Sequence, residues 1–199
     1  MASWICGPDF GPVNLVNALY SDVTFGMVAL IPLYATNRYG ISAFGSGTLP
    51  TAQGVATITV SIVAALMLRR TGHRLPLYLG SSAITIGTLL LALSPVADIR
   101  PYGWLAGSAF LVGVGTGMIN PTSRNAGLQL APGQASTLTA LRSMCVQLGS
   151  MMTISIATTI LASFDHPGSM QAWVHVIAAL MLAAALPLIA RVPEHRGSW

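Results

Sequence analysis

Two ionisable side chains stand inside long apolar stretches of the sequence, where charge is expensive and therefore informative. Asp22 lies in the run from Asn14 to Thr36, and Arg142 lies near the start of the run from Ala135 to Ala162. An ionised group within a membrane-crossing run costs about 2.5–3.5 kcal/mol on insertion scales, which makes it a functional candidate by default. Asp22 could take up protons or contact a substrate; equally, it could lie near an interface or pair with an arginine to hold helices together.

Helical spacing gathers polar side chains around Asp22. At about 100° per residue, Asn17 and Thr24 fall on the same arc as Asp22, and large apolar residues fall on the opposite side. Such an arc is expected to face protein or a water-filled cavity. Arg142 could neutralise Asp22 or meet an anionic group, whereas Arg124, which closes the preceding apolar run, is better explained as an anchor at the membrane surface.

No arrangement typical of an enzyme is present. The string FGSG at 44–47 lacks the first glycine of a GxSG nucleophile turn, and the sequence contains no GxxxxGK[ST] phosphate-binding loop. Clusters of His, Cys, Asp and Glu with metal-ligand spacing are absent, and Cys6 and Cys145 are too few for a disulfide framework. The sequence therefore predicts no enzyme, no metal and no cofactor. Because the basic residues are scattered, it also predicts no nucleic-acid partner.

The elements that must position these residues are membrane-spanning helices. The chain is 53% hydrophobic and only 7% charged, with a mean hydropathy of +0.69, whereas a soluble domain carries about 25% charged residues. Runs this long and unalternated favour helices over barrel strands. We expect an all-α membrane protein, a single six-helix domain over residues 1–199, surrounded by a lipid bilayer. The six predicted spans are about 14–36, 49–68, 75–96, 102–123, 135–162 and 172–190.

The arginines predict how these spans are oriented. The turn RRTGHR, residues 69–74, lies between two spans and holds three of the nine arginines. The same side receives Arg124, Arg191 and Arg196 as well, and the opposite side receives only Arg38 and Arg100. Since arginines concentrate in cytoplasmic loops, this turn and both termini are expected in the cytoplasm.

The same turn also resembles a known signature. The stretch ALMLRRTGHRLPLYLG at 65–80 is similar to the second-half copy of the loop signature of the major facilitator superfamily. Arg70, Gly72 and Arg74 match that signature, whereas Arg69 stands where the family has an aspartate and Ala65 replaces its leading glycine. The missing acid puts the usual charge relay in doubt for this half. The whole chain resembles the C-terminal six-helix half of such a transporter.

Two longer strings resemble the drug:proton antiporter branch with fourteen helices. They are LIPLYATNRYGISAFGSGTLPTAQG at 30–54 and GVGTGMINPTSRNAGLQLAPGQASTLTALRSMCVQLGSMM at 113–152. The resemblance implies proton-coupled efflux of drugs or hydrophobic small molecules across a bacterial plasma (inner) membrane. Residues expected to line the substrate and proton pathway are Asn17, Asp22, Gln53, Asn120 and Arg142.

One half of such a transporter is not expected to transport by itself. A complete one places its site between two six-helix halves, so this chain would need a second six-helix unit, either a copy of itself or a separate chain. The alternative is an inactive truncated fragment or a non-catalytic membrane packing module.

Overall fold

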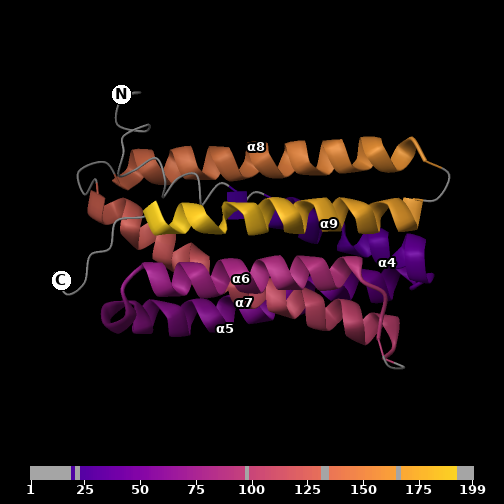
Figure 1. Ribbon diagram of the computed structural model, residues 1–199, viewed down its shortest axis with the longest axis horizontal. Coiled ribbons are helices and arrows are strands. Elements are labelled where there is room, and N and C mark those ends of the chain that lie inside the picture. The colour runs from indigo at the N-terminus through magenta and orange to yellow at the C-terminus, as the bar shows by residue number, and fades with distance from the viewer. Residues whose placement is uncertain (1–18, 21–22, 97–98, 131–134, 165–166, 192–199) are drawn as a thin grey trace.

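The computed structural model describes residues 19–20, 23–96, 99–130, 135–164 and 167–191, and the described part is helical (Figure 1). In chain order its helices are α3 (Val23–Ala29), α4 (Ile31–Tyr39), α5 (Ala43–Thr71), α6 (Arg74–Ala92), α7 (Pro101–Leu130), α8 (Ala135–Ala162), α9 (Pro167–Ala185) and the 3₁₀ helix η3 (Leu186–Arg191). The all-α class expected from the sequence is confirmed.

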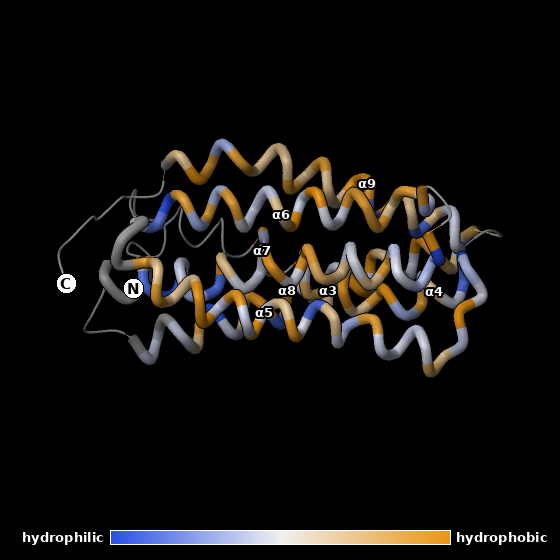
Figure 2. The backbone as a smooth tube through the Cα atoms, turned by 90° about the horizontal axis from the view of Figure 1, so that it is seen from below, coloured by the Kyte–Doolittle hydropathy of each residue, from blue (hydrophilic) through white to orange (hydrophobic). Residues whose placement is uncertain are grey.

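The long helices run up and down side by side in one bundle (Figures 1 and 2). The turn between α5 and α6 lies at the same end as the last turns of α7 and the start of α8. The opposite end holds α4, the start of α7 and the end of α8 (Figure 1). Five described helices are long and apolar enough to cross a membrane: Ala43–Leu68, Arg74–Ala92, Pro101–Asn125, Thr139–Ala162 and Pro167–Ala190. The chain is therefore a multi-pass membrane protein.

The first predicted span is not one continuous helix. The predicted span over about 14–36 is interrupted at Leu30, between α3 and α4, and its first residues lie outside the described part. The physical cause is Pro32, which has no backbone N–H to donate to the carbonyl four residues earlier and whose ring crowds the preceding turn. Leu30 N instead bonds to Met27 O at 3.1 Å, three residues back.

One further span ends earlier than predicted, for a related reason. The third predicted span was to reach residue 96, but α6 ends at Ala92 and Leu93 is extended, with ψ 149°. Ser94 precedes Pro95, and a residue before proline is biased away from helix. The sixth predicted span, to residue 190, ends where the apolar stretch Pro167–Ala190 ends; within it, α9 reaches Ala185 and the remaining turns, with Pro187, form a 3₁₀ helix.

Glycines allow α7 to lie directly against two neighbouring helices. A Cβ added at Gly117 would stand 2.8 Å from the carbonyl oxygen of Thr57 on α5. On the α6 side, a Cβ at Gly80 would stand 2.8 Å from the carbonyl oxygen of Gly115, and one at Gly87 would stand 2.7 Å from Val112. Lipid supplies no hydrophobic drive between helices, so close backbone approach is what holds such contacts. The α5–α6–α7 group forms the tightest part of the bundle.

The bundle leaves α5 and α8 largely exposed. Only 17% of the most apolar stretch of α5 and 11% of that of α8 is buried, against 50% for α6 and α7. Contact between α8 and α3 centres on Gly26, where a Cβ would stand 2.6 Å from Thr153. The exposed faces of α5 and α8 must therefore meet lipid or another helical unit.

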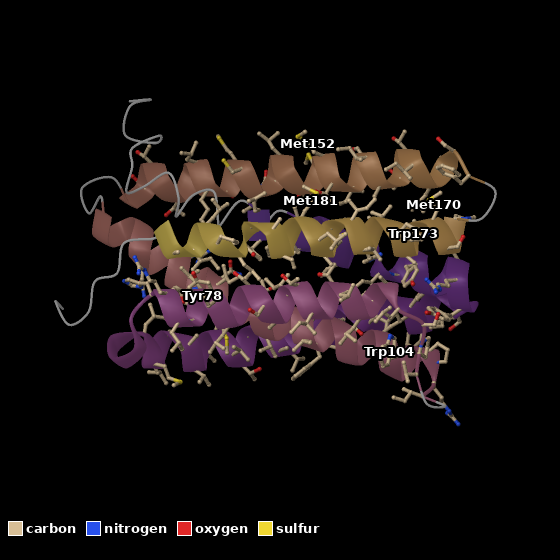
Figure 3. All side chains as sticks on the ribbon, viewed as in Figure 1. Tyr78, Trp104, Met152, Met170, Trp173 and Met181 are labelled. Atoms are coloured by element: carbon tan, nitrogen blue, oxygen red, sulfur yellow. The ribbon has the colours of Figure 1, made fainter. Side chains whose placement is uncertain are left out.

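Large aromatic side chains lie toward both ends of the helices. Figure 3 shows Trp104 and Trp173 near the end that holds α4, and Tyr78 nearer the opposite end. Such residues prefer the interfaces between lipid and water. Trp104 also has a structural bond, because its Nε1 donates to the carbonyl oxygen of Leu90 on α6 at 2.9 Å.

Candidate functional site

Three polar side chains meet between the last third of α7 and the first third of α8. Nη1 of Arg142 donates to Oγ of Ser123 at 2.8 Å, and Nη2 donates to Oδ1 of Asn120 at 3.1 Å. Ser123 is buried, whereas Asn120 and Arg142 are half-buried. The structure thus brings together two of the sequence-predicted pathway residues and adds Ser123, which the sequence analysis missed.

Helix geometry explains how these groups converge. Asn120 and Ser123 are three residues apart, so they lie one above the other on the same face of α7. Arg142 lies near the beginning of α8, at the end of the bundle where α7 finishes (Figure 1). The planar guanidinium can direct several N–H groups at once, and here two of them are directed at α7. The arrangement fixes the position of a permanent cation between α7 and α8.

Gln53 lies elsewhere. Its side chain is buried on α5, where Nε2 donates to Oγ1 of Thr57 at 3.2 Å. The Thr57 hydroxyl is also 2.8 Å from the Gln53 carbonyl oxygen and 3.2 Å from that of Gly113 on α7. These contacts satisfy polar groups at the α5–α7 contact. A role for Gln53 in a transport pathway stays a prediction.

The other predicted pathway residues, Asn17 and Asp22, lie outside the described residues. The first described polar residue after them is Thr24, which is 2% exposed and whose Oγ1 has no hydrogen-bond partner in the described part of the chain. Whether a proton-binding acid stands beside Arg142 therefore stays a prediction.

The loop signature forms the turn between α5 and α6. Gly72 ends α5 with φ 71°, a left-handed value that a side chain would strain, and its N–H bonds to Leu68 O at 3.2 Å. Arg70 belongs to the last turn of α5, and Arg74 begins α6 as a half-buried side chain. The glycine of the motif is thus explained by backbone geometry, independently of any charge relay.

A second polar group, at the opposite end of the bundle, was not anticipated. Arg38 on α4 donates to the hydroxyl of Tyr34 at 2.6 Å and to Oγ of Ser94 at 3.0 Å. It also reaches the carbonyl of Ala92, the last residue of α6, at 3.4 Å. A cation is favourable at a helix C-terminus, where carbonyls lack donors. From the sequence, Arg38 was expected only as one of two arginines on the outer side of the membrane. In the structure it links α4 to the end of α6.

This second group continues onto α9. The ring of His175 lies 5.1 Å from that of Tyr34, and Nε2 of Gln171 donates to the carbonyl of Leu30 at 2.8 Å. Gln171 and His175 are both 0% exposed. The sequence analysis considered neither a candidate, although their spacing of four residues on an apolar helix places both on one face. That spacing is the signal that could have identified them.

The apolar spans and the arginine held between α7 and α8 define a bundle of membrane helices with a polar cluster between two of them. The family model of the Major Facilitator Superfamily matches residues 10–154. The chain therefore belongs to that superfamily, whose members are transporters and not enzymes. No curated protein matches the sequence significantly.

Solved transporter structures share the fold. The chain is similar to tetrameric PepTSo2, with a TM-score of 0.73 and 18% identity, over 91% of this chain and 40% of that one. It is also similar to a POT family transporter solved with 5-aminolevulinic acid, with a TM-score of 0.73 and 22% identity, over 89% of this chain and 36% of that one. At such identities the likeness concerns the fold. The chain spans less than half the length of either structure.

Proposed function

We propose that this chain forms one half of a proton-coupled secondary transporter for small organic molecules. The observation that carries the proposal is the Arg142 cluster: a guanidinium held by Asn120 and Ser123 between two helices of a transporter half. A cation kept at this position in apolar surroundings costs free energy. A cation at this position is useful to a transporter, because the cation can attract an acid or an anionic group in one conformation and release that group in another.

Transport would proceed by alternating access, in which two halves rock about a site near the middle of the membrane. A proton can drive such a cycle only by binding the inward-facing and outward-facing states with different affinity. We assign the proton to Asp22 and the positioning of charge to Arg142, with Asn17, Gln53 and Asn120 along the pathway. Neutral Asp22 and ionised Asp22 would then favour different states.

A second six-helix unit is part of this proposal. The chain corresponds to 40% of PepTSo2 and 36% of the POT family transporter, and the exposed faces of α5 and α8 offer surface for a partner half. That unit would be a copy of this chain or a separate polypeptide. If no such unit assembles, the chain is an inactive fragment or a packing module for another membrane protein.

For the substrate we propose hydrophobic drugs or drug-like molecules, exported in exchange for protons, because the sequence strings at 30–54 and 113–152 resemble that branch. Peptides are the second candidate, since the similar solved structures include proteins described as peptide transporters. We place the protein in a bacterial inner membrane with both termini in the cytoplasm, following the arginine distribution.

The test is proton flux in proteoliposomes that contain a trapped pH-sensitive dye. Ethidium and a dialanine peptide are added in separate experiments, and cross-linking in the same vesicles reports which oligomer is present. We expect ethidium to drive proton movement, and Asp22→Asn to abolish it without loss of insertion. Movement with dialanine alone would replace the first substrate class by the second. No movement with either, in vesicles where the cross-linked oligomer is present, would overturn the transport proposal.

A further inference from the structure

Arginines from four helices gather at one end of the bundle. Arg69 and Arg70 belong to the last turn of α5, and Arg74 begins α6. Arg124 lies in the last two turns of α7, and Arg191 is the last residue of η3. Figure 1 shows that the α5–α6 turn, the last turns of α7 and the end of α9 all lie at this end. The fold therefore brings together arginines that are far apart in the sequence.

The contact between α6 and α7 places Arg74 and Arg124 at nearly the same level along the bundle. The two helices run in opposite directions, and a Cβ added at Gly80 would stand 2.9 Å from the side chain of Ile119. Arg74 is six residues before Gly80, and Arg124 is five residues after Ile119. Each residue advances an α-helix by about 1.5 Å, so the two arginines differ in level by about one residue. One anionic group at this level can therefore meet both helices.

The sequence provides no carboxylates in the connections at this end to balance the arginines. The chain has five acidic residues, and all lie outside the described residues: Asp9, Asp22, Asp98, Asp165 and Glu194. None of them falls in the two connections at this end, residues 72–73 and 131–134, whereas Asp98 and Asp165 fall in connections at the opposite end. The end that holds the α5–α6 turn is therefore complementary in charge to an anionic partner.

Apolar side chains are exposed directly beside these arginines. On α6, Leu75 and Leu79 are both about half exposed, and their spacing of four residues places them on one face. On α5, Leu66 is largely exposed one turn before Arg70. Tyr78, which Figure 3 shows toward the same end, is also exposed. A molecule bound here would meet cations at its head and apolar surface along its length.

We propose that an anionic phospholipid binds at this end, with its phosphate at Arg74 and Arg124 and its acyl chains along Leu75 and Leu79. Guanidinium groups hold phosphate oxygens through paired N–H bonds, and clusters of arginine beside membrane helices attract acidic lipids. Arg74 is half-buried and Arg124 is exposed, so both side chains retain accessible surface for a headgroup. Free phosphate would use the arginines but leave the apolar face unused.

The experiment is native mass spectrometry of the full chain, released from neutral detergent micelles that contain dioleoyl phosphatidylglycerol or dioleoyl phosphatidylcholine. The fraction of protein that retains one lipid, measured across a titration, gives a Kd for each lipid. We expect phosphatidylglycerol to bind several-fold more tightly. Arg124→Gln should weaken its binding about fivefold, which is the factor that one arginine contributes near an acidic membrane surface. The matched control is Arg100→Gln, the same replacement at an exposed arginine of the opposite end, which should leave the Kd unchanged.

Glycerol 3-phosphate distinguishes a lipid from a free phosphate, since it has the headgroup phosphate without acyl chains. It should not displace phosphatidylglycerol at equal concentration, and displacement would assign the arginines to a soluble anion instead. Equal Kd values for the two lipids in the unaltered protein, or equal weakening in Arg124→Gln and Arg100→Gln, would also overturn the proposal. The unaltered protein alone decides the first comparison, so the proposal stays testable if a variant fails to fold. Because the measurement requires neither transport nor a second six-helix unit, its failure is distinct from failure of the proposed function.

Discussion

The proposed transport depends most directly on the guanidinium of Arg142, which donates to two uncharged side chains of α7, Asn120 and Ser123. Hydrogen bonds to charged groups contribute about 1.5–3 kcal/mol each, so the Asn120 and Ser123 contacts hold the side chain firmly. Lysine would keep the charge but present a point rather than a planar fork. Replacements at position 142 can therefore separate the contribution of the positive charge from that of the planar shape of the guanidinium.

We predict that Arg142→Lys lowers proton-coupled flux about 10-fold, since the loss of one charge-assisted bond corresponds to about 1.4 kcal/mol or more. Arg142→Met should abolish flux. Asn120→Asp, which offers the guanidinium an ionised partner, should hold it more tightly and also slow transport. Flux in proteoliposomes measures all three, and equal activity of Arg142→Met and the unaltered protein would exclude the cluster from the mechanism.

The hydrogen bond of Trp104 allows the contribution of one side chain to stability to be measured without any transport assay. Trp104→Phe removes the Nε1 bond to Leu90 O, which should reduce the free energy of unfolding by about 1 kcal/mol. The matched control is Trp173→Phe on α9, where the side chain is 62% exposed. Thermal unfolding in detergent should show a lower Tm for the first variant only. A similar shift in both would attribute the effect to interfacial anchoring of the indole ring.

At the scale of the helices, whether a glycine contributes to packing depends on where it lies along the helix. Gly117 lies against the α5 backbone, whereas nothing lies within 4 Å of a Cβ placed at Gly107 on the same helix. We predict that Gly117→Ala separates α7 from α5 and lowers Tm, while Gly107→Ala is neutral or stabilising by up to about 1 kcal/mol through helix propensity. Thermal unfolding of the pair measures both effects. Equal destabilisation would mean that close approach at Gly117 contributes nothing.

The elements also show how far the sequence could predict this structure. Apolar runs locate membrane helices well, because lipid forces every backbone group into an internal hydrogen bond. The break at Leu30 could be suspected from Pro32, but the hydrogen bond that Leu30 O accepts from Gln171, 141 residues further along the chain, could not be. Likewise, polarity alone marked Asn120 and Arg142. Their meeting with Ser123 depends on how α7 and α8 pack, which no local pattern specifies.

At the scale of the whole molecule, charge is distributed unevenly between the two ends of the bundle. Arg74 and Arg124 lie at the end where α5 turns into α6, and Arg38 and Arg100 lie at the other. Arg69 and Arg70, in the last turn of α5, also lie at the first end. Translocation of so many guanidinium groups is unfavourable, so the α5–α6 turn should remain on the cytoplasmic side.

This orientation predicts that a reagent in the outer compartment reaches the connection between α6 and α7 but not the start of α6. In a variant with Cys6 and Cys145 replaced by serine, we expect Leu75→Cys to react with a membrane-impermeant maleimide only after the cells are permeabilised. Ile99→Cys should react in intact spheroplasts. Both positions are about half exposed, at 52% and 48%, and neither substitution removes an arginine. Labelling of both cysteines from the same side would mean that α6 does not cross the membrane, and the proposed pathway between two aqueous compartments would then have no basis.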